Sequence, residues 1–269
     1  MGRLKQLRID PGSKIRLADF ETRDDGGLKR EEAEAELQQV KARLIELEEL
    51  LYADGRFALL IVFQAMDTGG KDSTIRSVFS GVNPASTRVV SYKAPNDVER
   101  RHDFLWRIHQ NTPRLGHITI FNRSHYEDVL VVRVKSLVPE ARWRARYDHI
   151  NNFEQMLHDE STRVVKFFLH ISKAFQKERL EKRLADPKKH WKFDPNDVAE
   201  RKHWDDYQHA FEVMLERCST DHAPWYVIPA ETRWYRDLLV AKAVVKTLES
   251  LDLKFPKPTF DAATIHIDD

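Results

Sequence analysis

The chain has 269 residues, of which 41% are hydrophobic and 10% aromatic, a composition that excludes an intrinsically disordered protein and suffices for a substantial core. Although 32% of the residues are charged, the formal net charge is only +1, so any binding of a polyanion must depend on local clusters of cations. The single cysteine, Cys218, excludes an intrachain disulfide. We find neither a signal peptide nor a membrane-spanning run, and therefore expect a cytoplasmic protein with no membrane partner.

A first helix is predicted between residues 28 and 52. Its apolar residues recur at alternating steps of three and four, which places them on one face: Leu37, Val40, Leu44, Leu47 and Leu51. Packing on the core is the favoured explanation for this face, and a dimer seam is the alternative. We divide the chain into an N-terminal extension with this amphipathic helix (1–55), a core (56–251) and a polar C-terminal tail (252–269).

From Phe57 onward, short β-branched or aromatic runs alternate with longer charged amphipathic stretches, which is typical of an α/β protein. The runs predict five strands, at residues 57–64, 87–93, 117–124, 162–171 and 225–230. Several are nearly continuous in apolar character, so we expect all five to be buried in a parallel sheet covered on both faces. A last helix is predicted at about residues 232–251. The expected fold is therefore a three-layer α/β fold.

The segment 172–207, between the fourth and fifth predicted strands, is strongly basic. Residues 173–192 hold eight basic and three acidic side chains, a local net charge of +5, and prolines at 187 and 195 separate two helical stretches. A solvated helix face would explain the charge equally well. Because the segment is a basic helical hairpin inserted late in an α/β fold, we interpret it as a helical lid.

A glycine-rich stretch, FQAMDTGGKDST at residues 63–74, follows the first predicted strand and precedes a helix. It departs from the phosphate-loop (Walker A) pattern G-x-x-x-x-G-K-[ST] at Ala65 and Asp72. A glycine-rich turn at a helix start still exposes N–H groups that bind phosphate, whereas a simple glycine turn with a solvent-facing lysine is the alternative. The expected phosphate contacts are Thr68, Gly69, Gly70, Lys71, Ser73 and Thr74.

Two carboxylates stand in this anion-binding loop. Asp67 would repel bound phosphate unless a cation lies between them, so we expect it to be a ligand of Mg²⁺, for which Mn²⁺ can substitute. Asp72 lies at the start of the helix, where we interpret it as a helix cap.

In the third predicted strand, the apolar run ITIF (118–121) is followed by Asn122. In phosphate-loop enzymes, a hydrophobic strand beside the first one often ends in an aspartate near the metal. The following RSHYED sequence supplies Arg123, Glu127 and Asp128 at the carboxyl edge of the sheet, where ligands bind in open α/β proteins. We expect Asp128 to be the second metal ligand. The alternative is that Glu127 and Asp128 form an acidic first helical turn.

These motifs together resemble the polyphosphate kinase 2 family, whose members transfer phosphoryl groups between inorganic polyphosphate and nucleotides in a thymidylate-kinase-like P-loop fold. The resemblance extends from about Leu51 to Leu251. It rests on MDTGGKDSTI (66–75), SGVNP (80–84), IFNRSHYEDVLV (120–131) and the lid sequence DPKKHWKF (186–193), which together are specific. The sequence NRSHYED (122–128) is similar to that of the class III branch, whose members phosphorylate both AMP and ADP.

The resemblance implies catalytic roles for Asp67, Lys71, Arg123 and Asp128, with Asp67 and Asp128 at the metal. It also links Glu127 to the choice of acceptor. We expect nucleotide contacts at Asn83, Asn122, Glu127 and Arg133, and Arg133 would also balance charge on the transferring group. A long polyphosphate donor would need a track of cations, which could consist of Lys71, Arg76, Lys93, Arg179, Lys182, Arg183, Lys188, Lys189 and Lys192. From the family, the expected partners are inorganic polyphosphate, the nucleotides AMP, ADP and ATP, and further copies of the chain in a homo-oligomer.

The expected reaction is in-line phosphoryl transfer from polyphosphate to AMP or ADP. One alternative is an ATP-dependent nucleoside monophosphate kinase with the same fold, which differs in its donor only. A second is a non-catalytic module that binds polyanions, although such a module gains nothing from Asp67 and Asp128. Nucleic acid is not expected as a partner, because the basic cluster has few interleaved aromatics and no recognised reading motif.

Overall fold

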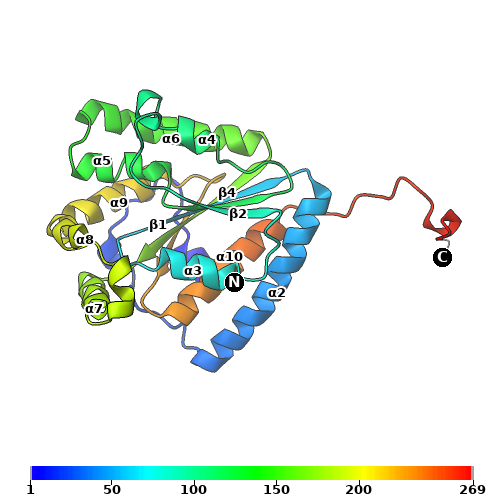
Figure 1. The fold of residues 1–269 in the computed structure, drawn as a ribbon, viewed down its shortest axis with the longest axis horizontal. Helices are drawn as coiled ribbons and strands as arrows, with labels where there is room; N and C mark the ends of the chain where they lie inside the picture. The colour runs from blue at the N-terminus through cyan, green and yellow to red at the C-terminus, as the bar shows by residue number, and fades with distance from the viewer. Residues whose placement is uncertain (1, 268–269) are drawn as a thin grey trace.

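The centre of the molecule is a five-stranded parallel sheet with the strand order β2-β3-β1-β4-β5. The computed structural model describes residues 2–267 of the chain (Figure 1). The strands are β1 (Ala58–Ala65), β2 (Thr87–Ser91), β3 (Ile118–Asn122), β4 (Thr162–His170) and β5 (Trp225–Pro229). All five predicted strands are confirmed. Because they are parallel, the loops that follow β1 and β3 emerge at the same edge of the sheet.

The five strands differ in how deeply they are buried. Every residue of β1, at the centre, is buried, as its unbroken apolar sequence predicts. The prediction that all five strands are buried was wrong for β2, where Val89 is 51% exposed. β2 lies at one edge of the sheet and has a neighbour on one side only, whereas β5, at the other edge, is fully buried and accepts a hydrogen bond from the N–H of Ile9 at the carbonyl oxygen of Trp225.

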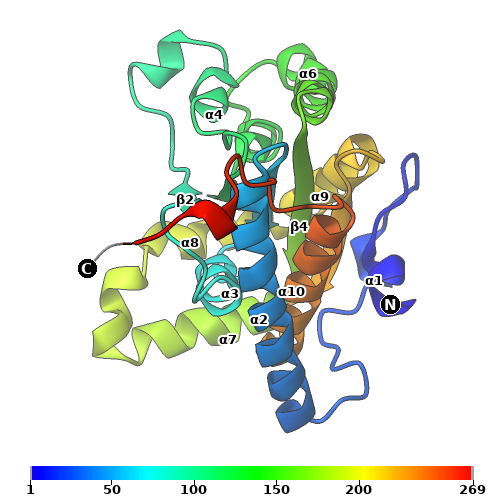
Figure 2. The same ribbon diagram turned by 90° about the vertical axis from the view of Figure 1, so that its right-hand side faces the viewer.

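Helices cover both faces of the sheet and form the predicted three layers (Figures 1 and 2). One face carries α2 (Arg30–Asp54), α3 (Lys71–Val78) and α10 (Arg233–Glu249); the other carries α6 (Glu140–Asp159) and α9 (Trp204–Cys218). Helix α2 packs along α10 and buries Leu37, Leu44, Leu47 and Leu51. Core packing is therefore the explanation that holds for this face of α2, and its leucines are not free to form a dimer seam.

The remaining elements are short. They are α1 (Gly2–Leu7), η1 (Leu17–Asp19), η2 (Glu99–Arg101), α4 (Trp106–His109), η3 (His125–Asp128), α5 (Val131–Val134) and η6 (Ala262–Thr264). Within residues 2–267, no helix combines the length and the apolar character that crossing a bilayer would require.

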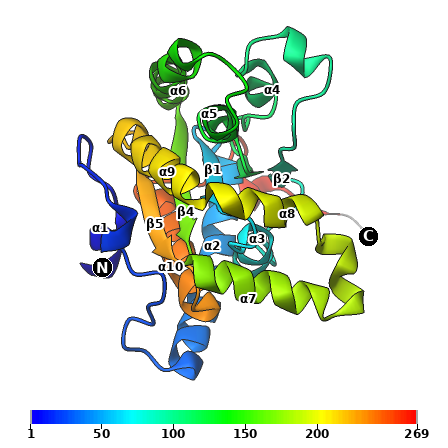
Figure 3. The same cartoon turned by 90° about the vertical axis from the view of Figure 1, so that its left-hand side faces the viewer.

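The basic segment forms a helical hairpin that projects from the body (Figure 3). It consists of α7 (Lys173–Leu184), η4 (Pro187–Lys192), α8 (Pro195–Glu200) and η5 (Arg201–His203). Ser172, Asp186 and Asp194 cap its three main helices, and a proline opens η4 and α8. Residues 204–207, which we had included in the lid, belong instead to α9, where Trp204 and Tyr207 are buried in the core.

Candidate active site

The loop between β1 and α3 is shaped by two glycines. A Cβ atom on Gly69 would lie 2.6 Å from the Cβ of Ala65 and 2.8 Å from the carbonyl oxygen of Met66, so no larger residue fits. Gly70 has φ 99° and is the N-cap of α3. Thr68 also adopts a positive φ of 65°. The chain therefore turns tightly from the carboxyl end of β1 into a helix N-terminus, as a phosphate loop requires.

The side chains that we expect to bind phosphate are folded onto the loop's own backbone. Nζ of Lys71 donates to the carbonyl oxygen of Ala65 at 3.0 Å, and the side chain is buried. The hydroxyls of Ser73 and Thr74 donate to the carbonyl oxygen of Gly70 at 2.8 and 3.1 Å. Burial lowers the pKa of Lys71, and Arg123 lowers it further. A bound anion would raise the pKa of Lys71 again, because it offers the ammonium group a partner of opposite charge.

Asp72 does not cap α3, so our interpretation of it was wrong. Its carboxylate lies in the first turn and accepts a 2.8 Å hydrogen bond from Nδ2 of Asn122. Asp72 and Asn122 thus connect the start of the P-loop helix to the end of β3. This contact holds the two walls of the site together, and it fixes the orientation of the Asn122 amide.

Asp67 and Arg123 form the second link between these walls. Nη2 of Arg123 donates to Oδ1 of Asp67 at 2.7 Å. Arg123 has φ 63°, and its backbone N–H donates to the carbonyl oxygen of Phe63 in β1, so the chain bends sharply where β3 ends. Burial would lower the pKa of Arg123, but Glu127 and Asp67 hold it above its usual value.

A pocket of about 980 Å³ opens beside Arg123. Its walls come from residues 92–107, from the turn η3 and from α6. Its volume is that of a typical small-ligand site. The lining is rich in cations: Lys93, Arg100, Arg101, Arg107, Arg123, Arg142 and Arg146. Apolar side chains such as Phe104, Leu105 and Val138 complete it. The pocket therefore combines groups for a phosphate with a surface for a flat apolar ring system.

Two of the expected acidic residues, Glu127 and Asp128, line this pocket. Nη1 of Arg146 donates to both the carboxylate and the carbonyl oxygen of Asp128, each at 3.0 Å. Burial raises the pKa of Asp128 to about 6, although Arg146 and Arg107 oppose the rise. A carboxylate that is costly to keep charged gains when a metal ion binds to it.

The sequence analysis missed five of the pocket's arginines, Arg100, Arg101, Arg107, Arg142 and Arg146. They belong to charged stretches that read as ordinary surface helices. For Arg100, Arg101 and Arg107, the aromatic residues between them in VERRHDFLWR (98–107) are a signal that could have found them.

Arg236, in α10, is another residue that sequence reasoning missed. It is only 2% exposed, and Nη2 donates to Oγ of Ser73 at 3.3 Å. A Cβ atom on Gly70 would lie 2.3 Å from its Nη1, so the guanidinium rests directly on the P-loop. Asp237 accepts hydrogen bonds from it and fixes its position. Arg236 stands after the last strand, at the same edge of the sheet as the loop, and this position is a usable signal.

The lid cations differ in what they contact. Lys182 pairs with Glu178, and Lys189 pairs with Asp186, on exposed surfaces. Lys188 is exposed, and Nζ of Lys192 lies 4.7 Å from the ring centroid of Trp191. Nη1 of Arg183 in α7 lies 3.6 Å from Oδ2 of Asp197 in α8. Arg179 is half-buried, and its pKa is lowered by burial and then by Arg233, Arg183 and Arg236. Arg179 is therefore the lid cation that extends the positive charge around the P-loop.

Three predicted contacts lie away from this centre. Asn83 precedes β2 and so lies at the opposite edge of the parallel sheet, where its side chain accepts from the N–H of Ala85 and forms a turn. The guanidinium of Arg133 stacks on Trp143, 4.8 Å from the ring centroid, and lines a separate hollow. Arg76 is exposed on the last turn of α3. The structure therefore does not bring these three residues to the pocket.

The carboxylates suit a metal that is held largely by its substrate. Within the described residues 2–267, no group of three or more His, Cys, Asp or Glu side chains is arranged to hold a metal ion. Mg²⁺ needs only one or two carboxylates when phosphate oxygens and waters supply its other ligands. Asp67, which is partly exposed, and Asp128, which faces the pocket, fit that description.

Comparisons with known proteins agree with this geometry. The family model for polyphosphate kinase 2 (PPK2) matches residues 27–256. The chain is 51% identical over 259 residues to the AMP/ADP-polyphosphate phosphotransferase of Meiothermus ruber, which covers 95% of this chain and 96% of that protein. It is 42% identical over 268 residues to the ADP-polyphosphate phosphotransferase of Rhodopseudomonas palustris, over 95% of this chain and 93% of that protein.

A solved structure has the same fold. The crystal structure of polyphosphate kinase 2 from Arthrobacter aurescens TC1 superimposes with a TM-score of 0.92 at 42% sequence identity, over 96% of this chain and 93% of that one. The family indicated by the four sequence motifs is thereby confirmed. The chain belongs to the polyphosphate kinase 2 family.

Proposed function

We propose that the protein transfers a phosphoryl group from inorganic polyphosphate to AMP and ADP, giving ADP and ATP. The observation that carries the proposal is the junction at Arg123, which contacts Asp67 of the P-loop and also lines the cationic pocket. Two anionic substrates can therefore meet there, one on each side of a single guanidinium. The names of the relatives from Meiothermus ruber and Rhodopseudomonas palustris support polyphosphate and adenine nucleotides as the pair.

The nucleotide acceptor would occupy the pocket. Arg107, Arg142 and Arg146 would bind its phosphates, and Phe104 would contact its base. An acceptor phosphate oxygen is ionised at neutral pH, so its attack requires no general base. Glu127, at the rim beside Arg123, would repel a misplaced phosphate and so favour one acceptor length over another.

The donor would lie on the P-loop. Lys71 and the N–H groups at the start of α3 would hold its terminal phosphates, and Arg123 would balance the charge of the transferring group. Arg236 and Arg179 would bind the following phosphates: Arg236 contacts Ser73 of the loop, the positive charge of Arg236 lowers the pKa of Arg179, and neither residue lines the pocket. A chain of phosphates needs such a track, whereas the triphosphate of ATP does not.

Asp67 and Asp128 would hold Mg²⁺, for which Mn²⁺ can substitute. Once bound, the metal supplies positive charge that screens the phosphates from each other and from the two carboxylates. The residues of the chain set the remaining conditions: Arg146 orients Asp128, Arg123 orients Asp67, and the lid excludes water when it closes.

The test is a comparison of donors with purified protein, AMP and Mg²⁺. We expect ADP, and then ATP, to form with polyphosphate as the sole donor, and EDTA to stop the reaction. ADP formation with ATP but not with polyphosphate would identify an ATP-dependent nucleoside monophosphate kinase instead. Polyphosphate binding without turnover of any nucleotide would identify a non-catalytic module.

A further inference from the structure

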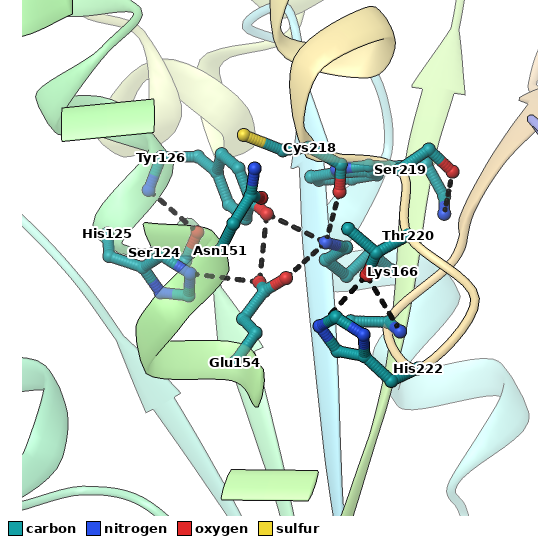
Figure 4. Close-up of polar contacts among 12 residues, drawn as sticks. Ser124, His125, Tyr126, Asn151, Glu154, Lys166, Cys218, Ser219, Thr220 and His222 are labelled. Carbon is teal, nitrogen blue, oxygen red and sulfur yellow. Dashed lines mark hydrogen bonds and ion pairs between the residues drawn. The ribbon is translucent and has the colours of Figure 1, made fainter. Parts of the chain in front are cut away.

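A fully buried polar cluster lies directly beneath the turn that carries Glu127 and Asp128 (Figure 4). Its members are His125 and Tyr126 of that turn, Glu154 of α6 and Lys166 of β4, and none of the four has exposed surface. None contacts the pocket or the P-loop, so the proposed chemistry does not use them directly. A lysine in the middle of a central strand of the sheet therefore needs a separate explanation.

The cluster is closely hydrogen-bonded. Nζ of Lys166 donates to the hydroxyl of Tyr126 at 2.8 Å, to the carbonyl oxygen of Cys218 at 2.7 Å and to Oε2 of Glu154. Oε1 of Glu154 accepts from the Tyr126 hydroxyl at 2.8 Å and pairs with Nε2 of His125 at 3.2 Å. Figure 4 shows that Tyr126 bridges the two charged groups. All three donors of the lysine therefore have partners.

The protonation states are consistent with these bonds. Burial lowers the pKa of His125, which favours the neutral imidazole, and its Nε2 lies 3.2 Å from Oε1 of Glu154. Burial would raise the pKa of Glu154, but Lys166 and His125 hold it below its usual value. Burial lowers the pKa of Lys166, and the attraction of Glu154 opposes this shift. The hydrogen bonds pair the Glu154 carboxylate with the Lys166 amine.

Stability alone does not account for such a pair. Removing two charges from water is costly, and apolar residues of similar volume often stabilise a fold equally well. What the pair supplies is a fixed geometry, because each hydrogen bond restricts both distance and direction. The turn η3 needs that help: it is four residues long, and its start follows the positive-φ residue Arg123.

The turn is anchored from two sides. His125 and Tyr126 point into the cluster, whereas the next two residues, Glu127 and Asp128, face the pocket. Helix α6 contributes Glu154 below the turn and Arg146 at the pocket, where it binds Asp128. A shift of Tyr126 would therefore move Asp128, two residues further along the same short turn.

We propose that Glu154 and Lys166 are positioning residues, which hold Glu127 and Asp128 in place through Tyr126 and His125. The inference rests on the proposed function, because it assumes that Asp128 and Glu127 act on the metal and the acceptor. It adds that the buried ion pair is required for the rate of transfer and not for binding of polyphosphate.

The test uses the full-length protein with two variants. Glu154→Gln combined with Lys166→Met removes both charges together at similar volume and leaves no unpaired charge. Tyr126→Phe keeps the aromatic packing and removes only the bridging hydroxyl. We expect kcat to fall at least about tenfold for the double variant and about threefold or more for Tyr126→Phe. We expect the KM for polyphosphate to stay within about twofold of wild type.

The matched control is Val164→Ala, which creates a cavity in the same strand, two residues from Lys166, and breaks none of these hydrogen bonds. It should lower the temperature of unfolding while kcat remains within about twofold. Wild-type kcat in both the double variant and Tyr126→Phe would overturn the proposal. The proposal would also be overturned if Val164→Ala unfolded at the same temperature as the double variant and lost as much kcat as the double variant does.

Asp128→Asn, measured alongside, separates the two hypotheses. If it turns over at the wild-type rate, the role of Asp128 in the proposed function is wrong, and the positioning role falls with it. If it is inactive while the double variant and Tyr126→Phe are fully active, the proposed function stands and only the positioning role is overturned.

Discussion

Oδ1 of Asp67 accepts a 2.7 Å hydrogen bond from Nη2 of Arg123, and this pair joins the P-loop to the end of β3 across 56 residues of sequence. The two side chains are 31% and 40% exposed, so solvent weakens their attraction. A metal ion would compete for Asp67, and a phosphate would compete for Arg123. The pair therefore balances the charges of the site without substrates and can separate at little cost when they bind.

The first prediction concerns the charge of Asp67. Asp67→Asn keeps an oxygen that can accept from Arg123 but removes the charge that we assign to the metal. We expect kcat to fall by about 10²–10³-fold, with polyphosphate binding unchanged or tighter because one negative charge is gone. Steady-state kinetics and a binding titration measure the two effects.

Asp72→Asn is the matched control for this prediction, since it lies five positions along the same loop and keeps an acceptor for Asn122. Its kcat should change less than about threefold. Equal losses in the two variants would mean that the overall charge of the loop, and not a metal at Asp67, sets the rate.

The second prediction concerns the stability cost of Asp128. Its pKa rises from the ordinary value of 3.8 to about 6 in the folded protein, so the fold favours its protonated form. Its contribution to stability is then largest below pH 4 and is lost as the pH rises through 6. Such a shift corresponds to an upper limit of about 3 kcal/mol.

Asp128→Asn should therefore raise the free energy of unfolding of the metal-free protein at pH 8 while it abolishes turnover. The gain should shrink as the pH is lowered from 8 to 5. Denaturant unfolding of both proteins in EDTA across that range measures it. A variant that is less stable than wild type at pH 8 would show that the charged carboxylate stabilises the fold, contrary to its burial.

Much of the fold could be predicted because its signals are local. The apolar run of β1 and the glycines at 69 and 70 each determine a short piece of backbone, and the motifs then follow in the order that the family requires. The exposure of β2 was not predictable in this way, because it depends on which edge of the sheet the rest of the chain leaves uncovered: β5, at the other edge, is fully buried.

The site was predicted less completely, because its contacts are long-range. Asp72 is bound by Asn122, a residue 50 positions away, and no pattern around Asp72 reveals that partner. Asn83 was assigned to the nucleotide from a motif, yet the parallel topology places it at the opposite edge of the sheet. Arg236 contacts Ser73 only because α10 packs against α3, the helix that follows the P-loop.

The third prediction concerns this contact. Arg236→Lys keeps the charge but loses the fork that contacts Ser73 and Asp237 together. We expect the KM for polyphosphate to rise by roughly three- to tenfold, with the KM for AMP unchanged within about twofold. Lys242→Ala is the control: it lies on the same helix, pairs with Glu36 on α2 and should change neither constant. A rise in the KM for AMP alone would place Arg236 on the acceptor side.

The fourth prediction compares two cations of α7. Arg179 is half-buried and its pKa is lowered by burial and by the charges of Arg233, Arg183 and Arg236, whereas Lys182 is exposed and paired with Glu178. Arg179→Ala should therefore raise the KM for polyphosphate more than Lys182→Ala does, and it should also flatten the dependence of that KM on salt. Kinetics at several ionic strengths provide the measurement. Equal effects would indicate that polyphosphate follows the outer face of the lid.

The transfer itself can be followed with polyphosphate that carries ³²P in its phosphate groups, incubated with the protein, unlabelled AMP and Mg²⁺ in the absence of ATP. Direct transfer predicts that the label appears in the β-phosphate of ADP, that Asp67→Asn lowers the rate of its appearance by about 10²–10³-fold, and that little label is released as inorganic phosphate. Label found only in inorganic phosphate, or ADP formed only after ATP is added, would contradict the account.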